Sequence, residues 1–91
     1  MNIAQFLVEH PEFNSADLNL VQATLTAALL EIDPSVWRAK ADQGQAYLTC
    51  MKLARSPFGQ NARLVAKDGS TVYDLEYRRL VGQVSSGFRS T

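Results

Sequence analysis

The residues of this chain best suited to chemistry are its single histidine and its single cysteine. His10 has no cysteine or second histidine at a spacing that would complete a metal site, and as a general base it would need a nucleophile brought to it by the fold. Cys50 lies in a predicted helix, where Lys52 and Arg55 do not share its face to stabilise a thiolate. Both residues therefore favour structural roles, one as a helix-end histidine and the other as a small buried apolar side chain.

Glycines and carboxylates form no recognisable site either. Gly59 and Gly69 each stand alone, so the chain has neither the G-x-G-x-x-G pattern nor a P-loop for phosphates. No pair of Asp or Glu residues invites the acid and base chemistry of a glycosidase. We therefore expect a protein that is not an enzyme and that uses no cofactor and no metal.

The composition is that of an ordinary globular chain, with 46% apolar and 20% charged residues among 91. One cysteine excludes an internal disulfide. There is no run of about 18 apolar residues, which predicts no membrane span, and residues 1–13 lack the basic start of a signal peptide. We expect a single domain over residues 1–91 that is made in a cytoplasm.

Charge is divided unequally along the chain, although its formal net charge is zero. Residues 1–33 contain five acidic residues and no Lys or Arg, whereas residues 34–91 contain all nine basic residues and four acidic ones. Two arrangements fit this division: the two halves fold against each other, or unlike surfaces of neighbouring copies meet. The sequence leaves both open.

The apolar periodicity predicts an all-α fold, a small four-helix domain with helices near residues 3–10, 16–32, 34–55 and 72–86. Each predicted helix begins at a residue type that caps helices; the expected caps are Asn2, Ser15, Asp33 and Thr71. Pro11 should end the first helix, and Phe13 should then turn inward as an apolar plug.

The segment 16–32 is apolar along two lines rather than one. The first line contains Leu18, Val21, Leu25, Ala28, Leu29 and Ile32, and the second contains Leu20, Ala23, Ala27 and Leu30. Because a helix that is apolar on two faces is buried on two faces, we expect the second line to meet the last helix or another subunit. In the segment 34–55, the small Gly44 should permit a close approach by the segment 16–32.

A long connection separates the third predicted helix from the fourth. The span 56–71 is at the upper limit for a structureless connection in a compact domain, so we expect an extended loop or arm. Within it, Asp68-Gly69 after Leu64 is a hairpin signal, although the stretch is too short to give a sheet a core. Gly87 should end the last helix.

Nucleic-acid binding is an alternative that the second half of the chain raises. Phe58 offers a ring for stacking, and the basic residues near it or after it are Arg55, Arg63, Lys67, Arg78, Arg79 and Arg89. A dedicated nucleic-acid binder usually carries a clear basic excess, and this chain has none. A small helical regulator that binds DNA or a partner protein is therefore the second hypothesis.

Several segments, taken in their order along the chain, resemble the small head–tail adaptor proteins of tailed phages, also called head-completion or connector proteins. The segments are FLVEHPEF (6–13), the N-capped apolar segment after it, DPSVW (33–37) and AYLTCMKLA (46–54). The resemblance covers residues 3–54, and the group includes a family catalogued only as a domain of unknown function. That family usually has glycine after the tryptophan, where this chain has Arg38.

The resemblance implies a structural virion protein, mostly helical, that forms a homo-oligomeric ring between the portal and the tail. Such a ring seals the packaged DNA, with which it makes a passing contact, and it gives tail or neck proteins a docking surface without any cofactor. The implied location is the virion neck, with the host cytoplasm during assembly.

For the interfaces of such a ring, the charge division singles out acidic residues on one copy and basic residues on the next. The acidic candidates are Glu9, Glu12 and Asp17, and the basic candidates are Arg38, Arg63 and Lys67. Phe58 is a further candidate, on an arm that would reach the portal, the next subunit or the tail. The alternative for the span 56–71 is a surface loop packed on its own domain.

Overall fold

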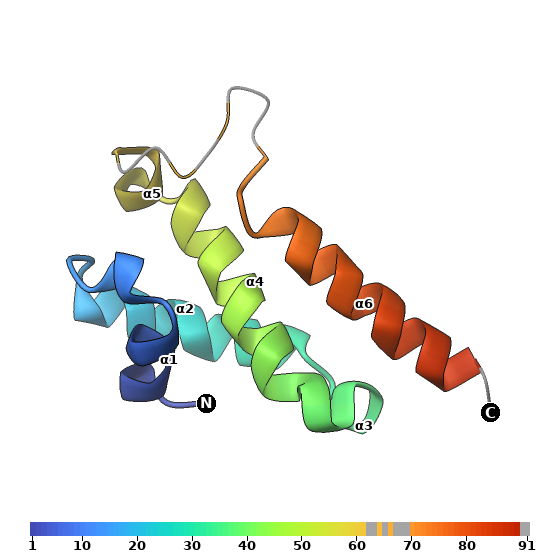
Figure 1. Ribbon diagram of the computed structural model, residues 1–91. Helices are drawn as coiled ribbons and strands as arrows, with labels where there is room; N and C mark the ends of the chain where they lie inside the picture. Colours follow the sequence, from blue (N-terminus) through green and yellow to red (C-terminus); the bar gives the residue numbers. More distant parts are fainter. Residues whose placement is uncertain (62–63, 65, 67–69, 90–91) are drawn as a thin grey trace.

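The computed structural model describes residues 1–61, 64, 66 and 70–89, and over these residues the protein is mostly helical and all-α. In chain order the elements are α1 (Ile3–Glu9), the 3₁₀ turn η1 (Pro11–Phe13), α2 (Leu18–Glu31), α3 (Pro34–Trp37), the 3₁₀ turn η2 (Arg38–Lys40), α4 (Ala41–Arg55), α5 (Pro57–Asn61) and α6 (Asp74–Arg89). Figure 1 shows α4 at the centre, with α1 on one side, α6 along the other and α2 crossing behind. The all-α class is confirmed, but the division into four helices and one long loop is not.

The N-terminal segment folds as its sequence predicts. The Asn2 side chain accepts a hydrogen bond from the backbone N–H of Gln5 at 2.8 Å and so caps α1. After α1 ends, η1 turns Phe13 into the core, where the ring is fully buried. Its ring centroid lies 5.8 Å from that of Phe6, and 5.9 Å from that of Tyr73, the residue just before α6. Phe13 therefore packs α1 against the segment that leads into α6.

Helix α2 begins two residues later than predicted, because its cap is Asp17 and not Ser15. The Asp17 carboxylate accepts a hydrogen bond from the backbone N–H of Asn19 at 2.8 Å. The inner face of the helix is buried against α4; its buried residues are Val21, Leu25, Ala28 and Ile32. Two polar contacts also join α2 to α4. Gln45 Nε2 of α4 donates to the Leu25 carbonyl at 3.0 Å, and Lys52 Nζ lies 2.7 Å from a Glu31 oxygen.

The predicted continuous helix over 34–55 is wrong, although its cap at Asp33 is confirmed by a 3.0 Å hydrogen bond from the Ser35 backbone N–H. The chain breaks after Trp37, passes through η2 and resumes as α4. At the break, Arg38 has φ 51° and ψ −122°, a conformation that costs residues with a side chain about 1–3 kcal/mol.

Packing of Trp37 explains the break. The nearest side-chain atoms to the missing Cβ of Gly44 belong to the Trp37 ring, and an added Cβ would lie 2.6 Å from it. In a continuous helix these two residues would be separated by about 10 Å along the axis, too far for the indole to cover Gly44. The reversal at Arg38 folds the indole back onto α4, where it also stacks on Tyr77 with centroids 5.9 Å apart. Gly44 therefore makes room for Trp37 rather than for α2.

The expected arm over 56–71 is partly helical and partly packed on its own domain. Helix α5 occupies Pro57–Asn61, and Gly59 lies so close to the Ala54 carbonyl that a Cβ there would clash with it. Phe58 is half-buried, with its centroid 6.1 Å from that of Phe13. Of the hairpin signal, Asp68-Gly69 lies outside the described residues.

Thr71 and Asp74 form the predicted cap of α6. The Asp74 carboxylate accepts hydrogen bonds from the Thr71 backbone N–H at 3.1 Å and from the Thr71 hydroxyl, and it pairs with the Arg55 guanidinium at 3.0 Å. Burial alone would raise the pKa of Asp74, but these hydrogen bonds and the Arg55 charge outweigh it and lower the pKa below its ordinary value. The helix then continues to Arg89, so Gly87 does not end it.

Replacing Arg38 by glycine should stabilise the fold, because glycine adopts a positive φ without steric cost. The gain should be about 1 kcal/mol, since the strain removed exceeds the backbone entropy that glycine adds to the unfolded chain. Chemical denaturation of Arg38→Gly measures it. Ala39→Gly, one residue along, is the control and should lower the free energy of unfolding. If Arg38→Gly lowered it as well, the backbone at Arg38 would not be strained.

Asp74→Asn should destabilise the protein at neutral pH by about 1–3 kcal/mol, since it removes a charged acceptor from a buried cap. The carboxyl has a lower pKa in the folded state than in the unfolded chain. Its contribution is therefore complete above the ordinary Asp pKa of 3.8 and is lost as the pH falls through the folded-state value. Unfolding of the wild type and of Asp74→Asn between pH 7 and pH 2 should show that the difference in their free energies of unfolding disappears in acid.

The control for this experiment is Glu76→Gln, which removes the exposed ion pair to Arg79 at 3.1 Å. That change should cost less than about 0.5 kcal/mol at any pH. If the free-energy difference between Asp74→Asn and the wild type stayed constant down to pH 2, the charge of Asp74 would not be what stabilises the cap.

Candidate interaction surface

The second apolar line of α2 is exposed to solvent. We call Leu20, Ala23, Ala27 and Leu30 the outer face of α2; all four are exposed, and Leu30 is 85% exposed. The expectation that the last helix covers this line is not met, because α6 lies beside α4 while α2 crosses behind it (Figure 1). Burying a leucine fully is worth about 1.5–3 kcal/mol. The outer face is therefore costly to leave in water and favourable to cover.

A second exposed surface lies on α6. We call Leu75, Arg78, Arg79 and Gly82 the outer face of α6; they share the side of the helix opposite the buried Leu80. Leu75 is 63% exposed, and Val72 just before the helix is 69% exposed. Apart from its two neighbours and the backbone of its own helix, nothing in the described residues lies within 4 Å of the position that a Cβ on Gly82 would occupy. The sequence places Arg78 and Arg79 on the outward side of the last helix, where solvation explains them, and only the structure shows the exposed Leu75 beside them.

Glu12 is bound within its own chain. Its carboxylate accepts a hydrogen bond from the Tyr73 hydroxyl at 2.6 Å and lies 3.8 Å from His10 Nδ1. Burial, and then the hydrogen bond to Glu12, raise the pKa of the Tyr73 phenol well above its ordinary value. Glu12 thus connects η1 to the start of α6, and the prediction that it pairs with a neighbouring copy gains no support from its position.

Glu9 and Asp17 do not form one patch with Glu12. Asp17 is occupied as the cap of α2. Glu9 lies at the end of α1, is exposed, and has no hydrogen bond or ion pair within the part of the chain that the structure describes. Of the three acidic candidates, Glu9 alone presents its carboxylate without an internal role.

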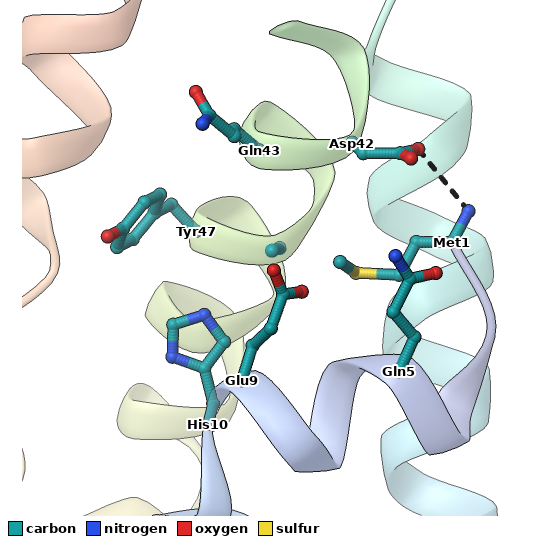
Figure 2. Close-up of a pocket in the computed structure, with 8 residues that line it drawn as sticks. Met1, Gln5, Glu9, His10, Asp42, Gln43 and Tyr47 are labelled. Carbon is teal, nitrogen blue, oxygen red and sulfur yellow. Dashed lines mark hydrogen bonds and ion pairs between the residues drawn. The ribbon is translucent and has the colours of Figure 1, made fainter.

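Glu9 lines an open groove of about 320 Å³ between α1 and α4, shown in Figure 2. The groove is lined by Met1, Gln5, Glu9, His10, Asp42, Gln43, Ala46 and Tyr47. At one end the Met1 amino group lies 3.4 Å from Asp42 Oδ1, and Tyr47 lies near His10 at the other. Asp42 is paired with the Met1 amino group, so Glu9 is the carboxylate of this groove that has no partner among the described residues.

The basic candidates are scattered. Arg38 is exposed at the break before η2. Arg63 and Lys67 lie outside the described residues. Lys40 Nζ of η2 donates to Gln83 Oε1 of α6 at 2.6 Å, and Lys52 of α4 pairs with Glu31 of α2. Phe58 packs on Phe13, which gives it a structural role in its own domain.

His10 and Cys50 lie in the interior of the aromatic and helical packing. The His10 ring is half-buried, with the Phe6 and Tyr47 centroids at 5.3 and 5.6 Å. Cys50 is fully buried, and burial raises the pKa of its thiol well above the ordinary value. In the described residues no three His, Cys, Asp or Glu side chains are grouped to hold a metal ion. Among those same residues no helix has the length and apolar character needed to cross a membrane.

Glu12→Ala should destabilise the fold by about 1–2 kcal/mol, because the buried Tyr73 hydroxyl loses its charged acceptor. Glu9→Ala is the matched control, with the same residue type removed three positions away, and it should cost less than about 0.5 kcal/mol. Thermal and denaturant unfolding of the two variants measure the difference. Equal costs for both would show that the Tyr73 contact does not stabilise the domain.

Comparison with known proteins identifies no relative. No protein-family model, no curated protein sequence and no solved structure matches the chain.

Proposed function

We propose that the protein is a structural subunit of a tailed-phage neck, a head–tail adaptor that forms a homo-oligomeric ring between the portal and the tail. The observation that carries the proposal is the outer face of α2, an apolar helical surface that the chain's own helices leave in water. A subunit whose partner is another protein needs such a surface, because burying apolar area drives association.

Two further features support the adaptor over other interaction proteins. The order of the segments 6–13, 33–37 and 46–54 resembles that of known head–tail adaptors, and the resemblance spans α1 to α4. Arg38 is the second feature. The backbone there adopts a positive φ, which suits the glycine that the resembled family usually has after its tryptophan. At the position after the tryptophan, the chain therefore has a positive φ, the conformation that glycine adopts most readily.

The proposal predicts that the purified chain binds portal rings. When the chain is mixed with portal rings of the phage or prophage that encodes it, the two should sediment together, faster than portal rings alone. Portal rings of an unrelated phage serve as the control. In the same phage, a stop codon early in the gene should give DNA-filled heads that lack tails in electron micrographs. Tailed, infectious particles from that mutant would refute the adaptor role.

The second hypothesis, a small regulator, predicts different results in the same assays. A regulator would sediment without the portal and would retard duplex DNA or capture a partner protein in solution. Retardation of duplex DNA at physiological salt, together with no binding to the portal, would replace the adaptor proposal.

A further inference from the structure

We infer that the joint between α3 and α4 is a conformational switch. Its first state is the bend at Arg38, and its second state is one continuous helix over residues 34–55. The position of α6 selects between the two states, because contacts from α6 hold the bend in place. The switch is a property of the free chain and does not depend on the adaptor role.

The bend is strained at the residue where the chain reverses. Arg38 has φ 51° and ψ −122°, a conformation that glycine adopts readily and that a residue with a side chain adopts only at a cost. The stretch 38–43 reads RAKADQ, and every residue in it except Asp42 is a strong helix former. The Asp33 cap and Pro34 begin a helix in either state. Local energetics at the joint therefore favour the continuous helix.

Contacts between distant residues favour the bend instead. The indole of Trp37 covers Gly44, where an added Cβ would lie 2.6 Å from the ring. The same indole stacks on Tyr77 of α6, with centroids 5.9 Å apart, and Lys40 Nζ donates to Gln83 Oε1 of α6 at 2.6 Å. Two of these three contacts end on α6, which runs along the side of α4 (Figure 1). The bend therefore depends on α6 lying against α4.

The two states exclude each other. In a continuous helix Trp37 would precede Gly44 by about 10 Å along the axis, so the indole would leave both Gly44 and Tyr77, and α4 would gain about two turns at its start. Trp37 and Tyr77 are each half-buried, so the contact that opposes the backbone strain is a modest one. By linkage, whatever moves α6 off α4 promotes the continuous helix, and the continuous helix weakens the hold on α6.

Gly44→Ala tests the switch from the side of α4, and Gly82→Ala, in the open space on α6, is the matched control. The added methyl group excludes the indole from residue 44, so the Cα chemical shifts of Arg38 and Ala39 should become helical. Trp37 is the only tryptophan of the chain, so its fluorescence reports this indole alone. The emission should move to longer wavelength, and acrylamide should quench it more strongly. Gly82→Ala should change neither signal.

A red-shifted Trp37 emission in Gly44→Ala, with the Cα shift of Arg38 still non-helical, would overturn the inference. The substitution would then displace one side chain without straightening the backbone.

Tyr77→Leu tests the switch from the side of α6 and decides the matter if Gly44→Ala does not fold. Leucine keeps an apolar side chain at this position but has no ring to stack on Trp37, so the Cα shift of Arg38 should again become helical. Leu75→Ala, on the exposed side of the same helix, is the control and should leave Arg38 unchanged. A wild-type shift of Arg38 in Tyr77→Leu would overturn the inference, because the bend would then not depend on α6.

Arg38→Gly provides the reversal. Glycine removes the strain of the bend and lowers the helix propensity of the joint, so both effects favour the bent state. In a chain that carries Tyr77→Leu, adding Arg38→Gly should return the Trp37 emission to its wild-type wavelength. An emission that stays red-shifted in the double variant would show that Tyr77→Leu loosens the domain without forming the continuous helix, and it would overturn the switch.

Discussion

Burial of Phe13 is the constraint on which most of this structure depends. A three-residue turn places its ring among Phe6 from α1, Phe58 from α5 and Tyr73 just before α6, with centroids 5.8 to 6.1 Å away. Elements far apart in sequence therefore share one apolar centre, and a chain of 91 residues has little other core to spare. The Glu12 contact to Tyr73 follows from the same turn, because η1 positions both Phe13 and Glu12. The first residues of the chain and the last helix are thus held by a single cluster.

Local signals predicted the all-α class and several helix starts, and non-local packing accounts for the errors in the helix division. Caps at Asn2, Asp33 and Thr71 follow from side chains that bond backbone groups two or three residues away, so a sequence pattern can reveal them. The break at Arg38 depends on Trp37 covering Gly44 and meeting Tyr77 forty residues later, which no local pattern encodes. Helix α5 was missed for the same reason, since it exists by packing Phe58 and Gly59 onto residues already folded.

The candidate surface was predictable in part. The two apolar lines of α2 were visible in the sequence. Of the two covers expected for the second line, the last helix does not reach it, and another subunit remains a prediction. The acidic candidates were harder to predict. A count of charges cannot distinguish a free carboxylate from one that caps a helix or accepts a hydrogen bond. Asp17 and Glu12 have such internal roles, and both are set by neighbours a sequence does not place in space. The α6 face needed the fold, since only its geometry shows which residues point away from α4.

Polar contacts fix the orientation of α2 and of α6 relative to α4, which bears on the proposed ring. A ring closes only if the angle between a subunit's two contact surfaces is constant, because each copy adds the same rotation to the last. Helix α2 is fixed to α4 by the buried hydrogen bond from Gln45 to the Leu25 carbonyl, and the exposed Glu31–Lys52 pair lies at the end of α2. The α6 face is fixed to the same helix by Asp74, which binds Arg55 of α4 and the cap residue Thr71 together. Buried polar contacts are directional where apolar packing is not, so they set orientation as well as stability. In this domain such contacts join both α2 and α6 to α4. The orientation of α2 relative to α6 is therefore set through α4.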